Sequence, residues 1–573
     1  MYKFMQTTLV PNLNQEREPQ KVTRPGSLLL IVMLAMLVCG FLFLDAILPL
    51  RGLWFYDALL HTQVGTWLLL PTHLLFPGKA TVFFQAGKYT ELPASLGTSW
   101  KETGLFVAAI VLLFVSYVIA LRVLPKRCSL RFVLISTILL GILCMLIPVV
   151  TSQDIFSYII YTRMSVLYHL NPLTTLPIAI RHDALYPYVY WVHQPSAYGP
   201  SWVIMTSLLQ GIALLGGHTS LLSMVLSLRF TGLLLHLSSA LLIWSISGQL
   251  QHLNGSLSSS SQNNRMLALL AFAWNPLLLF EACVNAHNDT AILFFVLLVI
   301  WALIPRVKGA LGFAALAAVL LAIAVGLKIT MVVLFPGLLL FLWAQNARRI
   351  LSLSVVTVTF VGTIILLYAP FWQHGAVLQL FQVNPAAFHT INTPYEFLIR
   401  LIASINGFYV VPYSLSKSAP IERIAHGVSI LIFVIIYGIM CVRALLPASR
   451  LRTLPELIRW LAIVWLLFCL VGAPWFWPWY LITFFGLHAL IETSNISGRS
   501  ILGMFHQPWA TRLLTFSMFS TYWFSTIAPL KTAIPYLPHF QWAYFSGLWI
   551  WTLPLLALRL QRKPRILVQS WRS

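Results

Sequence analysis

Apolar runs of about twenty residues recur along most of the 573-residue chain, and short polar segments separate them. An α-helix needs about 20 predominantly apolar residues to cross the hydrocarbon core of a bilayer, so each long run is a candidate membrane span. We count about 13–15 apolar segments on this criterion. The pattern predicts an all-α, polytopic integral membrane protein, built as a helical bundle with large outer loops.

Charge decides how these segments are oriented. Lys and Arg number 36 against 14 Asp and Glu, a formal net charge of +22, yet only 9% of the chain is charged and 59% is hydrophobic. The basic residues gather in short loops between apolar runs, as the positive-inside rule requires of cytosolic loops. We therefore assign the loops 122–131 and 443–459 and the tail after residue 560 to the cytosol. A nucleic-acid partner is disfavoured.

The alternation of spans then divides the chain into five regions. They are a disordered cytosolic tail (1–26), N-terminal spans with an outer loop (27–131), a transmembrane module with the outer loop 151–200 (132–370), a second outer loop (371–423), and C-terminal spans with a basic cytosolic tail (424–573). The protein is expected to be multi-pass in the cell membrane, with its chemistry on the extracytoplasmic face.

Two apolar segments leave the topology open. The segment 53–76 carries polar and Pro residues, and we expect it to lie at the outer interface. An even number of crossings is needed between residues 154 and 289, whereas three apolar segments lie there. The shortest, 201–217, ends in two glycines, and we expect that it does not cross. The rival is that 53–76 crosses, which would move the basic loop 122–131 outside, against the charge rule.

The loop that begins at residue 151 is the first place where chemistry is expected. Asp154 directly follows the apolar run 132–150 and precedes an amphipathic, Tyr-rich stretch suited to the membrane surface. A carboxylate at the boundary of water and lipid is a candidate general base for a lipid-linked substrate. The alternative is structural, because Ser152 or Asp154 can simply cap the helix that follows.

A second polar cluster comprises Glu281 and the run His287-Asn288-Asp289, beside apolar helices. Polar groups this dense are costly in lipid, so they are expected to face a cavity, each other or a ligand. His287 and Asp289 are candidates for a divalent cation or for a phosphate head group held through one. Capping of the next helix by Asn288 and Asp289 is the alternative.

Further candidates come from single residues on the outer side. Lys328 lies between two apolar runs, where it either snorkels to the interface or binds a lipid phosphate. The aromatic block 475–480 is either an interfacial belt or a surface for sugar rings. The other candidate substrate- or phosphate-binding residues are Arg163, Tyr198, His389 and Glu396. Because the chain lacks a Gly-rich phosphate loop, a Walker motif and Cys/His metal spacing, we expect no required cofactor, with a divalent cation as an option.

Five short motifs occur in an order that resembles a known family. They are Ser152-Gln153-Asp154-Ile155-Phe156-Ser157-Tyr158, Asn171-Pro172, Tyr198-Gly199-Pro200-Ser201-Trp202, Asn275-Pro276-Leu277 and His287-Asn288-Asp289. Together they resemble the multi-spanning bacterial GT-C glycosyltransferases, especially the polyprenol-phosphomannose-dependent α-1,6-mannosyltransferases of the MptB type. The resemblance runs from about residue 132 to residue 370 and implies a GT-C-type bundle.

The resemblance also implies a reaction. It implies inverting transfer of a sugar, mannose by analogy, from a polyprenyl-phosphate donor to a glycan or lipid-linked acceptor outside the membrane, with a catalytic Asp matched by Asp154. Lys328, His287 or Arg163 would stabilise the leaving phosphate. Two alternatives remain at this point: a flippase or transporter of lipid-linked glycans, and an O-antigen polymerase or ligase. A transporter would predict an internal repeat and charges in mid-membrane, and the sequence offers little beyond Arg229.

Overall fold

The structure is a computed structural model of the whole chain. It describes residues 27–51, 63–77, 100–148, 150–217, 220–253, 259–304, 310–345, 348–379, 390–407, 420–492, 508–526, 533–534 and 536–561. The predicted tail 1–26 therefore lies outside the described residues.

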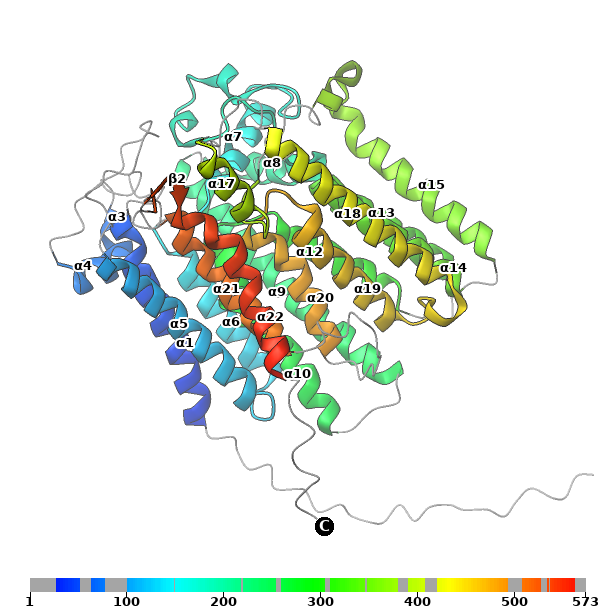
Figure 1. Ribbon diagram of the computed structural model, residues 1–573, viewed down its shortest axis with the longest axis horizontal. Coiled ribbons are helices and arrows are strands. Elements are labelled where there is room, and N and C mark those ends of the chain that lie inside the picture. The colour runs from blue at the N-terminus through cyan, green and yellow to red at the C-terminus, as the bar shows by residue number, and fades with distance from the viewer. Residues whose placement is uncertain are drawn as a thin grey trace, which may run out of the picture.

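Helices make up nearly all of the described chain (Figure 1). The α-helices are α1 (Ser27–Ile47), α3 (Gln63–Leu68), α4 (Leu70–Leu75), α5 (Trp100–Val123), α6 (Leu130–Met145), α7 (Asp154–Val166), α8 (Pro200–Leu215), α9 (Leu221–Leu253), α10 (Ser259–Ala273), α11 (Pro276–Cys283), α12 (Asp289–Ala302), α13 (Ala310–Leu327), α14 (Phe335–Gln345), α15 (Arg349–Tyr368), α17 (Glu396–Ile405), α18 (Pro420–Leu445), α19 (Leu454–Leu467), α20 (Ile482–Glu492), α21 (Pro508–Thr526) and α22 (Ser546–Gln561). Short helical turns include η4 (Ile329–Leu334), η9 (Phe468–Gly472) and η10 (Pro478–Leu481), and the strands β1 (Ala533–Ile534) and β2 (Leu537–Gln541) pair antiparallel.

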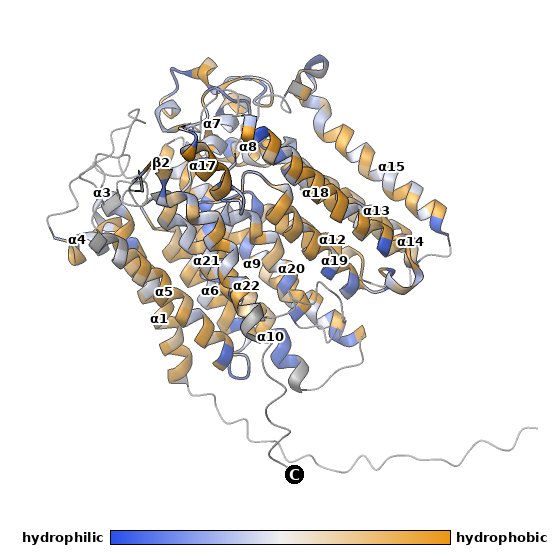
Figure 2. Cartoon of the chain, viewed as in Figure 1, coloured by the Kyte–Doolittle hydropathy of each residue, from blue (hydrophilic) through white to orange (hydrophobic). Residues whose placement is uncertain are grey.

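Seven of the helices in the described part of the chain are long and apolar enough to cross a membrane: α1, α5, α9, α13, α15, α18, and α19 continued by η9. The bent pair α10–α11 is an eighth candidate, and shorter apolar helices such as α6 and α12 run beside them. Figure 2 shows hydrophobic residues along the lengths of these helices and hydrophilic residues gathered toward their ends. The prediction of an all-α, polytopic membrane protein is confirmed.

The bend between α10 and α11 is encoded by two residues. Pro276 has no N–H to donate to the preceding turn, so a continuous helix cannot run through it. Asn275 accepts hydrogen bonds from the N–H groups of Leu277 (3.1 Å) and Leu278 (3.4 Å), which caps a new helix there. The two pieces meet at 47°. The second piece is short and carries Glu281 toward the end of the bundle where α7 begins.

A buried arginine shows how α9 is placed along the bundle. Arg229 donates to the carbonyls of Met145 (2.7 Å), Ile147 (2.6 Å) and Val284 (2.8 Å), so it lies level with the ends of α6 and α11. The part of α9 from Arg229 to its end is about 36 Å long at 1.5 Å per residue, which is already a full crossing. The start of α9 therefore projects beyond that end of the bundle.

Helix α8 begins and ends at this same end. Its N-cap, Gly199, donates from its N–H to the carbonyl of Leu327 at the end of α13 (3.3 Å), and its last residue comes shortly before the projecting start of α9. Both termini of α8 therefore lie near this end of the bundle, and that the segment 201–217 does not cross the membrane stays a prediction. In the segment 53–76, the described part forms only α3 and α4, of six residues each, and neither is long enough to cross.

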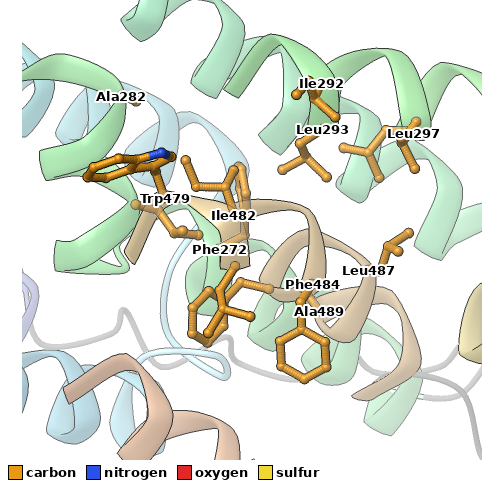
Figure 3. Close-up of a cluster of buried hydrophobic side chains, with 14 of the residues drawn as sticks. Phe272, Ala282, Ile292, Leu293, Leu297, Trp479, Ile482, Phe484, Leu487 and Ala489 are labelled. Carbon is orange, nitrogen blue, oxygen red and sulfur yellow. The ribbon is translucent and has the colours of Figure 1, made fainter. Parts of the chain in front are cut away.

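The core that supports this end of the bundle is apolar and closely packed. Figure 3 shows one cluster in which Trp479 lies together with side chains from α10, α11, α12 and α20. Close approach is possible there because Gly486 of α20 faces Leu293 of α12, and a Cβ at Gly486 would lie 2.4 Å from that leucine. The elements α7, α8 and α17 cover the end of the bundle above this core (Figure 1).

Candidate active site

The candidate active site begins at the first residue of α7. The Oγ of Ser152 accepts a hydrogen bond from the N–H of Asp154 (3.3 Å), so the serine satisfies the backbone there. The carboxylate of Asp154 instead points across to His287, with Oδ2 3.7 Å from Nδ1. Its side chain keeps 18% of its surface exposed. The helix start is thus satisfied by the serine, and the aspartate is left available for chemistry.

His287 lies in the turn that joins α11 to α12. Its ring stacks on Trp479, with centroids 3.8 Å apart and planes 15° apart, and its Nε2 lies 3.4 Å from Oε2 of Glu281. The hydroxyl of Tyr158 is 3.5 Å from Nδ1. Burial holds the pKa of His287 well below its usual value, so the ring is neutral near pH 7. A neutral imidazole lying between two carboxylates is fixed in place by groups on both sides.

A buried hydrogen-bond network holds Glu281 behind the histidine. Its two oxygens accept from the hydroxyl of Tyr522 (2.7 Å) and the amide of Asn285 (3.0 Å). The Asn285 carbonyl in turn accepts from the N–H of Thr151 (3.0 Å), three residues before Asp154. The network therefore links α11, α21 and the loop that carries Asp154, and it fixes the relative positions of Asp154 and His287.

In the described part of the chain, Lys328 is the cation nearest to the site, and it lies beside Asp289. Lys328 Nζ is 3.1 Å from Oδ1 of Asp289 and 3.3 Å from the centre of the Tyr480 ring. The other oxygen, Oδ2, is buried with no hydrogen-bond partner among the described residues. Asn288 precedes α12 without a capping bond from its side chain, and its amide contacts the Leu327 carbonyl at 3.5 Å. Capping therefore does not account for this cluster, whose side chains face one another.

Tyr198 completes the wall around Asp154. Its ring meets Tyr158 edge to face, with centroids 4.7 Å apart, and Tyr158 also packs against Trp202 at 5.0 Å. Burial raises the pKa of Asp154 to about 6, although a hydrogen bond from Tyr198 and the ammonium of Lys328 oppose that rise. A carboxylate with such a pKa is ionised at neutral pH and is still a stronger base than an ordinary aspartate.

The other sequence candidates lie elsewhere. Arg163 forms an ion pair with Asp183 inside the loop 151–200, with Nε and Nη2 2.9 and 2.8 Å from Oδ2. Glu396 starts α17 and lies 3.5 Å from Arg400, and burial raises the pKa of Glu396 to about 7. Neither side chain contacts Asp154 or Lys328 in any interaction described above. His389 lies outside the described residues.

Metal binding receives no geometric support from the described residues. They hold no group of three or more His, Cys, Asp or Glu side chains arranged to bind a metal ion. His287 faces Asp154 and Glu281, whereas Asp289 is paired with Lys328. The two residues considered as cation ligands therefore have different partners.

Comparison with known proteins gives one family match, which covers less than half of the chain. Residues 83–345 match the MptA/B family, described as alpha-(1->6)-mannopyranosyltransferase, N-terminal domain. This part of the chain is similar to a mannosyltransferase domain. The resemblance inferred from the short motifs is thereby confirmed, and the protein is a glycosyltransferase, which decides against the non-enzymatic alternative. No curated protein and no solved structure matches the chain.

The mannosyltransferase domain supplies most of the site but not all of it. Asp154, His287 and Lys328 lie within the matched region, whereas Trp479, Tyr480 and Tyr522 follow it. From the sequence, Trp479 and Tyr480 are considered only as part of the aromatic block 475–480, and Tyr522 is not a candidate. The only available signal was the density of aromatics in 475–480, and nothing local distinguishes Tyr522 from other tyrosines.

Proposed function

We propose that the protein transfers a mannosyl residue from a polyprenyl-phosphate donor to a hydroxyl group of a glycan or lipid-linked acceptor on the extracytoplasmic face. One observation carries the proposal. The partly exposed carboxylate of Asp154 and the ammonium of Lys328 lie close enough to interact electrostatically, and each is held by its own buried partner, His287 and Asp289. A base and a cation are the two groups that glycosyl transfer from a phosphate requires.

The reaction assigns one step to Asp154. The acceptor oxygen attacks the anomeric carbon and forms the new glycosidic bond while its proton passes to the carboxylate. The bond between the anomeric carbon and the phosphate oxygen breaks, and its electron pair leaves with the polyprenyl phosphate. Because attack and departure take place on opposite faces of the sugar, a single displacement inverts the configuration. His287 and Tyr198 act as positioning residues for the carboxylate.

Lys328 is suited to receive the leaving group. Its ammonium forms an ion pair with Asp289 and lies over the face of the Tyr480 ring. Lys328 directly follows the apolar helix α13, where a lipid-linked phosphate would reach the membrane surface. A donor phosphate would compete with Asp289 for the same cation, so binding would exchange one anion for another. The ammonium would then meet the charge that develops as the phosphate departs.

Charge supports placing the site on the extracytoplasmic face. Five arginines lie in or next to the connections α14–α15 and α18–α19, away from Asp154: Arg348, Arg349, Arg443, Arg450 and Arg452. Positive loops of this kind remain in the cytosol, so the opposite end, which carries the site, faces outward.

The test uses the full-length protein reconstituted in lipid vesicles. Wild type is supplied with radiolabelled polyprenyl-phosphate mannose and an α-mannoside acceptor, and labelled product is measured beside Asp154→Asn. We expect turnover to fall by about 10²–10⁴ in the variant, which removes the base and keeps the shape of the side chain. Glu456→Gln is the matched control. Glu456 belongs to the capping box at the N-terminus of α19, away from Asp154, and glutamine can take the same place in a capping box. Unchanged turnover in Asp154→Asn would refute the assignment of the base.

A further inference from the structure

A continuous series of aromatic rings leads away from the active site. It starts at His287, which stacks on Trp479, and Trp479 stacks on Trp477 with centroids 5.2 Å apart and planes 3° apart. Trp477 meets Trp475 at 6.4 Å, and Trp475 meets Trp191 of the loop 151–200 at 6.0 Å. We call the four tryptophans Trp479, Trp477, Trp475 and Trp191 the aromatic ladder.

The extended backbone explains why Trp475 and Trp477 share one side. Residues 474–476 are extended and pair with Ile391, whose N–H donates to the Pro474 carbonyl (2.9 Å) and whose carbonyl accepts from the N–H of Phe476 (3.1 Å). In an extended segment, alternate side chains point to opposite faces. Trp475 and Trp477 therefore point one way, whereas Phe476 points into the core and stacks on Trp551 at 5.6 Å; Trp479 follows in the helical turn η10.

The burial of the rings changes along the ladder. Trp479 is 7% exposed and is covered on its two faces by His287 and Trp477, so it anchors the series. Trp477, Trp475 and Trp191 are only half-buried. An interfacial belt would place isolated rings among lipid head groups, and it would not require a stack on the histidine beside Asp154. The ladder instead connects the active site to the surface of the loop 151–200.

We propose that the aromatic ladder binds the acceptor as an extended oligosaccharide. This inference rests on the proposed function, since it supplies the second substrate of that reaction. A pyranose ring has one face of C–H groups that packs against an aromatic face, while its hydroxyl groups remain in water. The steps between rings are comparable to the length of one sugar residue. Successive residues of the acceptor therefore lie along Trp191, Trp475 and Trp477, and its terminal hydroxyl reaches Asp154.

The ladder predicts that the enzyme senses acceptor length. We would measure KM and kcat in vesicles for octyl α-mannoside and for octyl α-(1→6)-linked manno-di-, tri- and tetrasaccharides. For wild type, KM should fall with each residue until the chain passes Trp191. Trp475→Ala and Trp191→Ala should each raise KM for the tetrasaccharide about five- to tenfold and leave the monosaccharide unchanged within about twofold. The shortest acceptor whose KM rises should be longer for Trp191→Ala than for Trp475→Ala.

The control is Trp542→Ala, which removes a tryptophan that is 44% exposed and lies in the short helical turn Trp542–Phe545 just before α22, outside the ladder. It should leave the length dependence intact. A wild-type KM that does not depend on length, or ladder variants that affect every acceptor equally as the control does, would overturn the inference.

Separate results would contradict the proposed function and the binding of the acceptor by the aromatic ladder. If wild type transferred mannose to none of these acceptors, the proposed function would fall. Saturation-transfer NMR of the tetrasaccharide with wild type and with Trp191→Ala would then test the ladder alone. Contact that is lost in the variant would support the ladder, and absence of contact with wild type would overturn it.

Discussion

The contact between Gly199 and Gly326 brings Tyr198 next to the chain that carries Lys328. A Cβ added at Gly199 would lie 2.2 Å from the carbonyl oxygen of Gly326, whereas ordinary van der Waals contact begins at 3.4 Å. Gly199 has φ −76° and ψ 178°, which any residue adopts without strain. Gly199→Ala therefore tests close packing alone and does not test backbone conformation.

The contact must open by about 1.2 Å to accommodate the methyl group, because both of its partners are backbone atoms that cannot rotate away. Gly199 follows the tyrosine that bonds Asp154, and Gly326 lies two residues before the lysine that pairs with Asp289. Displacements of about 1 Å in a site of this kind cost about 10² in rate. We expect kcat to fall by about this factor and the free energy of unfolding to fall by about 1–3 kcal/mol.

The assay compares mannosyl transfer in vesicles with thermal stability in detergent, for Gly199→Ala and for Gly362→Ala. The second glycine lies in the apolar helix α15 and has no atom within 4 Å of the added methyl group, so it should behave as wild type in both measurements. Wild-type turnover and stability in Gly199→Ala would refute the idea that this contact sets the site geometry. Equal losses in both glycine variants would show that the effect is not local.

Four further predictions follow from the site and its supports. The pH profile of kcat/KM should lose activity below about pH 6, because burial raises the pKa of Asp154 to about 6 and only its ionised form accepts a proton; a profile flat down to pH 5 would contradict this. Lys328→Met should move that limb to higher pH, since the ammonium lowers the pKa of Asp154, and should reduce kcat about a hundredfold; an unmoved limb would count against the assignment. Arg229→Met leaves three buried carbonyls without their donor and should lower the unfolding free energy by about 2–3 kcal/mol, read by denaturant titration; a change below 1 kcal/mol would be inconsistent with the clamp. Tyr522→Phe removes one donor to Glu281 and should cost about 1–3 kcal/mol in the same titration; a neutral variant would show that the bond contributes nothing.

Sequence reasoning located the parts of the site that are dense in polar residues. The sequence makes Asp154 a candidate because this carboxylate directly follows an apolar span and precedes a Tyr-rich amphipathic stretch, although the same position also suits a helix cap. His287, Asp289 and Lys328 were recognised because polar groups beside apolar helices are costly unless they meet partners. The structure brings these four together with Tyr198, although they come from separate parts of the chain.

Sequence reasoning did not identify the ion-pair partners of Arg163 and Glu396, nor the distant residues that support the site. Arg163 was a candidate phosphate ligand, yet Asp183, twenty residues later, folds back to pair with it, and no periodic pattern announces a loop contact. Glu396 has Arg400 one helical turn away, a spacing that was visible in the sequence. Trp479 and Tyr522 lie far along the chain from the residues that they hold. Only the packing of α20 and α21 against the mannosyltransferase domain reveals them.

The three hydrogen bonds that Arg229 donates to backbone carbonyls also constrain how the protein is made. When α9 enters the membrane during synthesis, the carbonyls of Met145 and Ile147 are already in place, but that of Val284 has not yet been translated. The guanidinium therefore spends that interval with an incomplete set of acceptors in a medium that penalises unpaired charge. Synthesis of the turn after α11 supplies that last carbonyl, and the same turn carries His287, which faces Asp154. The acceptors of Arg229 are therefore completed together with the turn that carries His287, whereas Trp479 and Tyr522, which hold His287 and Glu281, are translated later.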